Sequence, residues 1–325
     1  MNRTVIIGIA VAAATAIAIG SYAAFSGSSS TSAHSLIASS SNVTSNSSTA
    51  GGNEKIQVVA AENFWGSLVS QLGGTRIEVL SIVSDPNADP HEYESNNADA
   101  RAIANAGLVI VNGAGYDDWA LKLISAGNNP DQRVLNVAQL LGKKEGDNPH
   151  FWYSPAYVNQ TVHQMYSNLI AIDPSYTSYY KQQYANLNAT LGQYNSRIAE
   201  IRHQFAGTRV AATEDIFDYL ANATGLDLVS PPEFMQAVAE GNDPPAQSIT
   251  QFQQVLQNGN VNILVYNQQT VTPLTENIKA LAAQKNIPVV GISETIQPAD
   301  LSFQDWMGAE LVSIQNALNA RAQDH

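Results

Sequence analysis

Short apolar runs alternate with amphipathic helical patterns twice along the chain, and this alternation restricts the fold more than any other feature. Buried strands are expected at Ile56–Ala60, Ile77–Val83, Leu108–Asn112 and Arg133–Val137, and again at Arg209–Thr213, Leu226–Val229, Val261–Tyr266 and Pro288–Ile292. Helices are expected at Phe64–Leu72, Asp99–Asn105, Asp117–Ala126, Asp215–Ala223, Ile249–Gln257, Thr272–Gln284 and Phe303–Arg321. Strand–helix alternation of this kind predicts an α/β fold with two lobes, each a mainly parallel sheet covered by helices.

One long stretch, Pro174 to Phe205, separates the two sets of strands and contains no glycine before Gly192. Apolar residues recur there at three- and four-residue steps, which is the helical period. About 30 helical residues span roughly 45 Å at 1.5 Å per residue. The sequence therefore predicts a linker helix at 174–205 that joins lobes at 55–173 and 206–325. Because ligands of open α/β sheets bind beyond the carboxyl ends of the strands, the expected site lies in the cleft between the lobes.

The N-terminal region has a composition unlike that of the lobes. Residues 1–25 carry an apolar run behind Arg3 and are interpreted as a secretory signal peptide or a membrane anchor. Residues 26–54, dominated by Ser, Thr, Gly and Ala, are expected to form a flexible tether. Either interpretation places the lobes outside the cytoplasm, at the cell surface or in a periplasm-like space.

Charge and cysteine content exclude several classes of function. Lys plus Arg number 15 and Asp plus Glu 28, a net charge of 15 − 28 = −13. A chain this acidic, without basic clusters, is a poor binder of nucleic acid. The absence of cysteine excludes disulfides, thiolate metal sites and a lipidated N-terminal Cys. Any metal must therefore be bound by His, carboxylate or carbonyl groups.

Two of the six histidines follow a proline in matching tripeptides, Asp89-Pro90-His91 and Asn148-Pro149-His150. Proline restricts both itself and the preceding residue, so each imidazole stands on a stiff loop after a first-lobe strand. The alternative is that each His merely caps a helix or satisfies backbone groups. Two histidines with the same local pattern favour metal binding.

Glu214 and Glu294 take matching positions at the ends of two second-lobe strands. Taken singly, Glu214 could be an acid at a helix N-terminus and Glu294 a solvated loop charge. Together they favour the other half of a metal site. Two neutral imidazoles and two carboxylates balance a divalent cation, and mixed N and O ligands suit Mn²⁺, Fe²⁺ or Zn²⁺ rather than Ca²⁺ or Mg²⁺.

The chain resembles the metal-binding, substrate-binding proteins of ABC importers, the group with a rigid linker helix. The resemblance rests on ordered segments at 61–65 (Ala-Glu-Asn-Phe-Trp), 89–94, 108–119, 148–153, 213–220 and 289–295. It implies that the ligands are His91, His150, Glu214 and Glu294. The usual residue at the last position is Asp, so Glu294 is a departure. A Glu at 214 and the lack of a His-rich loop lean toward Mn²⁺ or Fe²⁺ over Zn²⁺.

The resemblance implies a binding protein, not an enzyme, that captures a divalent transition metal and delivers it to a membrane permease powered by a cytoplasmic ATPase. A monomer is expected, held at the membrane by the N-terminal segment if that segment is not cleaved. Two alternatives stay open. One is a surface adhesion module that is only stabilised by metal, and the other is an extracytoplasmic metallohydrolase with three metal ligands and a glutamate base.

Overall fold

The computed structural model describes residues 55–87, 90–127 and 129–323. The expected signal or anchor at 1–25, the expected tether at 26–54 and Asp89 lie outside the described residues. Within the described ranges, no helix is both long enough and apolar enough to cross a membrane.

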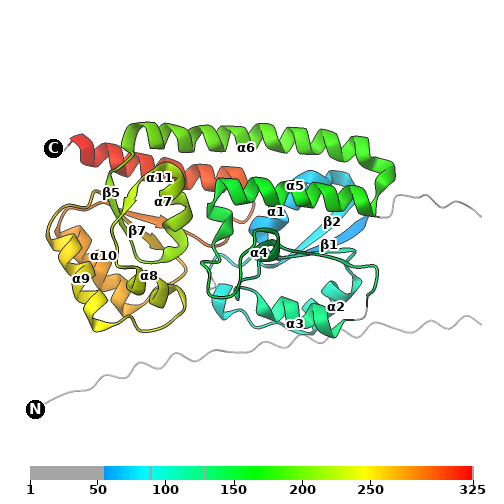
Figure 1. Cartoon of the computed structure of the whole chain (residues 1–325), viewed down its shortest axis with the longest axis horizontal. Helices are drawn as coiled ribbons and strands as arrows, with labels where there is room; N and C mark the ends of the chain where they lie inside the picture. Colours follow the sequence, from blue (N-terminus) through cyan, green and yellow to red (C-terminus); the bar gives the residue numbers. More distant parts are fainter. Residues whose placement is uncertain (1–54, 88–89, 128, 324–325) are drawn as a thin grey trace, which may run out of the picture. The chain divides into compact units, whose positions relative to one another are not determined.

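The first lobe is built on four parallel strands in the order β2-β1-β3-β4 (Figure 1). These are β1 (Ile56–Glu62), β2 (Ile77–Val83), β3 (Leu108–Val111) and β4 (Arg133–Asn136). Along β1, Val58 and Ala60 face one hydrophobic core and Val59 and Ala61 face another. Alternate residues of a strand point to opposite faces, so this strand is covered on both sides, as its continuous apolar sequence predicts.

Helices cover both faces of this sheet. One face packs against α1 (Asn63–Gly73), α5 (Pro155–Ile172) and the long helix α6 (Thr177–Phe205). The other packs against α2 (Asn97–Asn105) and α3 (Asp118–Ala126), while the short α4 (Val137–Leu140) follows β4. Ser154 caps helix α5, and Pro155 occupies its first turn.

The second lobe repeats the pattern with the strand order β6-β5-β7-β8, again parallel. Its strands are β5 (Arg209–Ala212), β6 (Asp227–Leu228), β7 (Leu264–Asn267) and β8 (Val289–Ile292). Its helices are α7 (Asp218–Thr224), α8 (Pro232–Ala239), α9 (Ala246–Gln257), α10 (Pro273–Gln284) and α11 (Phe303–Gln323). Helices α8, α9 and α10 cover one face, and α7, α11 and the end of α6 cover the other. Of these helices, α8 was not anticipated from the sequence.

Helix α6 runs along both lobes, and α11 packs against it (Figure 1). Its 29 residues give about 43 Å at 1.5 Å per residue. The residues that recur at helical steps in the predicted linker helix are mostly buried on one side of α6. Tyr180, Leu187, Leu191 and Tyr194 are buried, whereas Tyr184 is half-buried. One continuous core contains residues of both sheets, α6 and α11. The predicted class, two parallel α/β lobes joined by one long helix, is confirmed.

Candidate metal centre

Three of the four predicted ligands stand just beyond the carboxyl end of a strand or on the loop that follows it, and His150 lies on the loop after α4, the short helix that directly follows β4. His91 lies on a 3-10 turn, Pro90–Glu92, after β2, and His150 immediately precedes another, Phe151–Tyr153. Glu214 follows β5 by two residues, and Glu294 follows β8 by two residues. Because the strands of a parallel sheet point the same way, these positions share one edge in each lobe.

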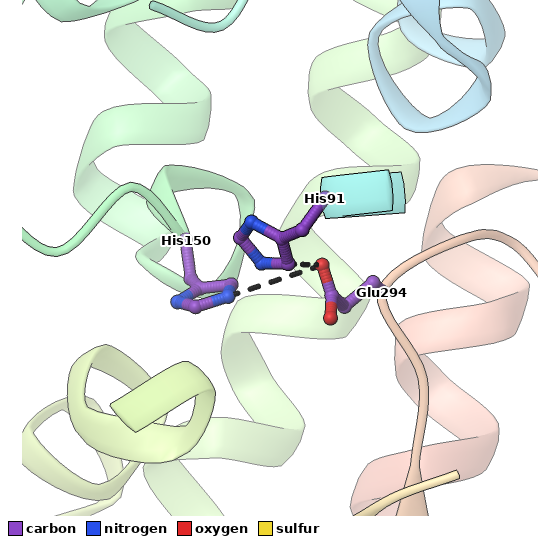
Figure 2. A group of neighbouring side chains, drawn as sticks. All are labelled: His91, His150 and Glu294. Carbon is purple, nitrogen blue, oxygen red and sulfur yellow. Dashed lines mark ion pairs between the residues drawn. The ribbon is translucent and has the colours of Figure 1, made fainter. Parts of the chain in front are cut away.

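The structure brings three of the four side chains together (Figure 2). One ligand atom from each of His91, His150 and Glu294 lies within 4.8 Å of the others. Glu294 Oε2 is 3.3 Å from His91 Nε2 and 4.0 Å from His150 Nε2. The side chains of His150 and Glu294 are fully buried, while that of His91 is 25% exposed. Buried His150 Nε2 has no hydrogen-bond partner among the described residues.

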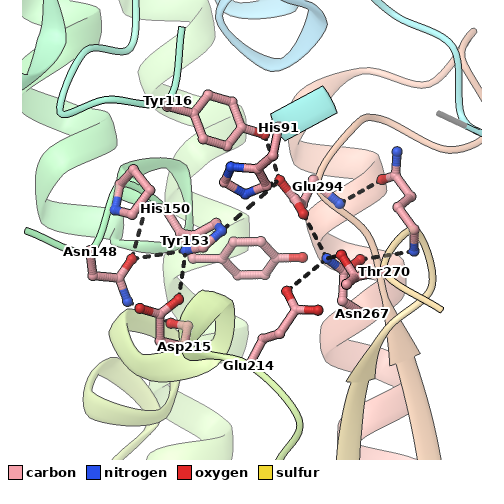
Figure 3. A network of polar contacts seen from close by, with 12 residues as sticks. His91, Tyr116, Asn148, His150, Tyr153, Glu214, Asp215, Asn267, Thr270 and Glu294 are labelled. Carbon is pink, nitrogen blue, oxygen red and sulfur yellow. Dashed lines mark hydrogen bonds and ion pairs between the residues drawn. The ribbon is translucent and has the colours of Figure 1, made fainter. Parts of the chain in front are cut away.

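Glu214 lies outside this close group but is joined to it by one amide (Figure 3). Asn267 Nδ2 donates to Glu214 Oε2 at 2.9 Å and to Glu294 Oε1 at 2.6 Å. The other oxygen, Glu214 Oε1, is buried and makes no hydrogen bond within the described ranges. A single amide group thus occupies the space between the two second-lobe carboxyls.

The two carboxyls have opposite pKa shifts. Burial raises the pKa of Glu214 to about 8, and the negative charge of Glu294 adds to that rise. Burial also acts to raise the pKa of Glu294. The charges of His91 and His150 and hydrogen bonds from His91 and Tyr116 outweigh burial, and they lower the pKa of Glu294 to about 2. Two buried like charges cannot both ionise without cost, so near neutral pH Glu294 carries the charge and Glu214 the proton.

Tyr116 and Gln269 also hold Glu294, and the sequence alone did not single them out. Tyr116 Oη, from the first lobe, donates to Glu294 Oε2 at 2.6 Å. Gln269 Oε1 accepts from the backbone N–H groups of Glu294 and Thr295 at 2.8 and 3.0 Å. Asn267 is the last residue of β7, which lies between β5 and β8, the strands that precede Glu214 and Glu294. This position was the one indication in the sequence that Asn267 could belong to the site.

The loop that presents Tyr116 is shaped by a glycine and a buried acid. Gly113 has φ +77°, and a Cβ at this position would lie 2.5 Å from Asn136 Oδ1. The backbone N–H groups of Asn112 and Gly113 donate to the Asp117 carboxyl at 2.6 and 2.7 Å. Glu62 is buried beside Asp117, and burial followed by the charge of Asp117 raises the pKa of Glu62 well above its ordinary range.

A cavity of about 480 Å³ borders the site, and His91, Tyr116 and His150 form part of its wall. The rest of the wall carries five acidic residues: Glu145, Asp147, Asp215, Asp218 and Glu240. No Lys or Arg belongs to the wall as the described residues define it. Burial, followed by the charge of Asp215, raises the pKa of Asp218 to about 6. The negative lining favours cations over anions.

The chain matches one family model over residues 58–317, described as ZnuA, zinc-uptake complex component A, periplasmic. A putative metal-binding protein of Treponema pallidum is 26% identical over 190 residues, which is 51% of this chain and 58% of that protein. The manganese-binding lipoprotein MntA of Halalkalibacterium halodurans is 27% identical over 187 residues, 54% of this chain and 60% of that protein. Each match therefore spans less than two thirds of the relative's length.

Solved structures show the same fold. The binding protein FpvC from Pseudomonas aeruginosa, in complex with Mn²⁺, superposes with a TM-score of 0.68 at 19% identity, covering 82% of this chain and 99% of that one. At this identity the likeness establishes the architecture alone. The family match, by contrast, spans most of the 325 residues. The chain belongs to the family of the periplasmic zinc-uptake complex component A.

Proposed function

We propose that this protein is the extracytoplasmic solute-binding component of an ABC importer, and that it captures Mn²⁺, Zn²⁺ or Fe²⁺ for delivery to a membrane permease with a cytoplasmic ATPase. Family membership and the metal-binding names of its relatives support this role. The observation that carries it is the meeting of His91, His150 and Glu294, from two lobes, with the buried His150 nitrogen lacking a hydrogen-bond partner in the described structure.

The spacing of these atoms suits one small cation. Two ligand atoms about 2.1 Å from a tetrahedral metal are about 3.4 Å apart. The 3.3 and 4.0 Å separations of Glu294 Oε2 from the two imidazole nitrogens lie near that value. A divalent ion bound there would replace the attraction between Glu294 and the histidines with direct coordination. Mixed N and O ligands favour transition metals over Ca²⁺ and Mg²⁺.

Glu214 is the proposed fourth ligand. Its Oε2 is joined to Glu294 by the Asn267 amide, and its Oε1 makes no hydrogen bond in the described structure. Coordination by Glu214 would require the loss of its proton, which the positive charge of the metal favours. Four protein ligands close the site and leave no position for a reactive water, which suits a carrier.

The remaining assignments extend the same proposal. Residues 55–173 and 206–325 are the two metal-binding lobes, and 174–205 is the linker. Residues 1–25 direct export and, if retained, anchor the chain, while 26–54 keep a monomeric protein close to its permease. The absence of cysteine means that any anchor is the apolar segment itself and not a lipid on Cys.

The test is metal binding by the purified full chain, measured by calorimetry with Mn²⁺ and Zn²⁺ and by metal content after native purification. The double variant His91→Ala with His150→Ala is expected to lose binding. His163→Ala, which removes an exposed imidazole on α5, is expected to bind like the wild type. Absence of binding by the wild type, or full binding by the double variant, would refute the proposal.

The two alternatives make different predictions. Family membership argues against the metallohydrolase, because the family consists of binding components of uptake systems and not of enzymes. An adhesion module would show a rise in melting temperature with metal, yet its deletion would leave cellular metal uptake unchanged. The importer component predicts a loss of Mn²⁺ or Zn²⁺ uptake on deletion, measured with radioactive metal.

A further inference from the structure

Asn148 makes hydrogen bonds in both lobes (Figure 3). Its Oδ1 accepts from the backbone N–H of His150 at 2.9 Å and lies 2.9 Å from His150 Nδ1. Its Nδ2 donates to the backbone carbonyl of Asp215 at 2.6 Å, and Tyr219 Oη donates to the Asn148 carbonyl at 2.9 Å. Asp215 and Tyr219 belong to the second lobe, and Asn148 and His150 to the first.

These contacts determine which nitrogen of His150 carries the proton. A backbone N–H can only donate, so the side-chain atom of Asn148 that faces it must be the oxygen. The Asp215 carbonyl can only accept, so the atom facing it must be the amide nitrogen. An amide oxygen cannot donate, and therefore His150 Nδ1 must donate to it. In the neutral ring the lone pair then lies on Nε2, the nitrogen that faces Glu294.

The second lobe strengthens this arrangement through charge. Asp215 Oδ1 lies 3.3 Å from His150 Nδ1, and the Asp215 side chain is only 16% exposed. The amide oxygen alone accepts this N–H, because Asp215 Oδ1 makes no hydrogen bond in the described structure and acts on the ring through its charge. Partners of this kind orient an imidazole and increase the basicity of its other nitrogen. Asp215 reaches His150 only while the two lobes are together.

We propose that Asn148 is a positioning residue that links the orientation of the His150 ligand to the closeness of the two lobes. With the lobes together, Asn148 and Asp215 hold His150 with Nε2 directed at the metal position. When a permease draws the lobes apart, the bonds to the Asp215 carbonyl and from Tyr219 break, and His150 loses its carboxylate partner. Loosened His150 then releases the metal faster. This inference rests on the proposed capture and delivery of a metal.

Three variants of the full chain separate the two halves of this role. Asn148→Ala removes both the acceptor for His150 and the donor to Asp215. Asn148→Asp keeps an acceptor for His150 but cannot donate to the Asp215 carbonyl. Tyr219→Phe removes one bond between the lobes and leaves every contact of His150 in place. Asn262→Asp and Tyr184→Phe are the matched controls. Asn262 donates to the Arg209 carbonyl within the second lobe, and Tyr184 contacts His163 between α6 and α5, outside the cleft.

The first readout is the tautomer of His150 in the metal-free protein, observed as its ring ¹⁵N shifts by NMR. The wild type, Asn148→Asp and Tyr219→Phe should show the Nδ1–H tautomer, and Asn148→Ala a mixture. The second readout is Mn²⁺ release, followed by tryptophan fluorescence after addition of excess EDTA. Trp152, whose ring centroid is 5.3 Å from that of His150, should report it. Asn148→Asp and Tyr219→Phe should release Mn²⁺ about 3- to 10-fold faster than the wild type.

A single Nδ1–H tautomer in Asn148→Ala, or wild-type release rates in both Asn148→Asp and Tyr219→Phe, would overturn the inference. If Asn148→Ala fails to fold, the other two variants still decide the link between the lobes. The tautomer is measured in the metal-free protein, so its result does not depend on whether the proposed function is correct. Failure of the wild type to bind Mn²⁺ or Zn²⁺ would overturn that function and leave the tautomer result intact.

Discussion

The two halves of the candidate centre are held in place by different means. In the first lobe, His150 is fixed by Asn148, two residues away, and both histidines follow prolines, His91 on a 3-10 turn and His150 just before one. In the second lobe, Glu294 is fixed by Gln269 and Asn267, which are 25 and 27 residues away, and by Tyr116, which is 178 residues away. Local chain geometry therefore sets most of the direction of the imidazoles, with support for His150 from the second lobe through Asn148, whereas the tertiary fold orients Glu294.

This difference has a consequence for substitution. A ligand on a proline-restricted loop has fewer distant contacts to lose, although His150 also depends on the second lobe through the hydrogen bonds that join Asn148 to Asp215 and Tyr219. A ligand held by side chains from other elements moves when any one of them is lost. The second lobe should therefore be the half in which small changes alter metal affinity and preference.

The largest effect within the carboxylate half should come from Glu294. Glu294→Gln removes the charged group that faces both histidines, and it should weaken Mn²⁺ and Zn²⁺ binding by at least about 100-fold, more than loss of a supporting residue. Glu214→Gln should cost only about tenfold, because Glu214 lies outside the close group and carries its proton near neutral pH. Calorimetric titration of both variants measures the difference.

Glu276→Gln is the control for these two changes, because Glu276 pairs with Lys279 on the surface of α10. Its affinity should match that of the wild type. Equal losses in Glu214→Gln and Glu294→Gln would show that both carboxyls bind the metal directly from the outset, and would contradict the unequal roles assigned to them.

A smaller effect is expected from Tyr116→Phe, which deletes the hydroxyl that the first lobe contributes to Glu294. The ring contact with His91, at 4.7 Å between centroids, should survive. Loss of one hydrogen bond to a charged acceptor should weaken metal binding by about 5- to 50-fold, measured by competition with a chromogenic chelator. Tyr179→Phe, at the far end of α6, serves as the control. Unchanged affinity in Tyr116→Phe would mean that the carboxylate half is held by its own lobe alone.

The smallest effect on metal binding should come from Glu310 of α11, whose carboxyl accepts a hydrogen bond from the backbone N–H of Ser293, the residue before Glu294. Burial raises the pKa of Glu310 to about 8, even though hydrogen bonds from Tyr153 and Ser293 act to lower it. A carboxyl with a raised folded-state pKa contributes stability that is complete below its unfolded pKa of about 4.3 and is lost as the pH rises toward 8.

Glu310→Gln has no such titration, so its stability should change less with pH. The melting temperature of the variant, relative to that of the wild type, should therefore rise between about pH 4.5 and pH 8. The corresponding change in the free energy of unfolding should be a few kcal/mol at most. Thermal melts of the metal-free proteins across this range measure it. A difference that stays constant with pH would show that Glu310 is ionised in the folded protein.

Much of the architecture was predictable from the sequence because it follows from local patterns. Ile77–Val83 matches β2 residue for residue, since a β-branched run between turn signals has few alternatives. Helix α8 was missed, although it begins at a proline that suits a first turn. Strand β7 begins at Leu264, later than expected, although the Ile263 carbonyl just before it already accepts from the backbone N–H of Ala211 on β5.

The predicted ligand set of His91, His150, Glu214 and Glu294 is still a prediction, although three of the four side chains meet. The roles of Tyr116 and Asn267 could not be predicted, because they depend on contacts between residues 27 to 178 positions apart. No local pattern encodes such contacts. The separation of Glu214 from the close group likewise depends on where the Asn267 amide lies.

The last helix has a consequence for how the chain folds. Six buried apolar residues of α11 complete a core that also contains residues of α6 and both sheets. A chain without α11 therefore has an unfinished core in both halves at once. Folding then finishes only when the C-terminus has emerged, and the finished protein should melt in a single cooperative transition.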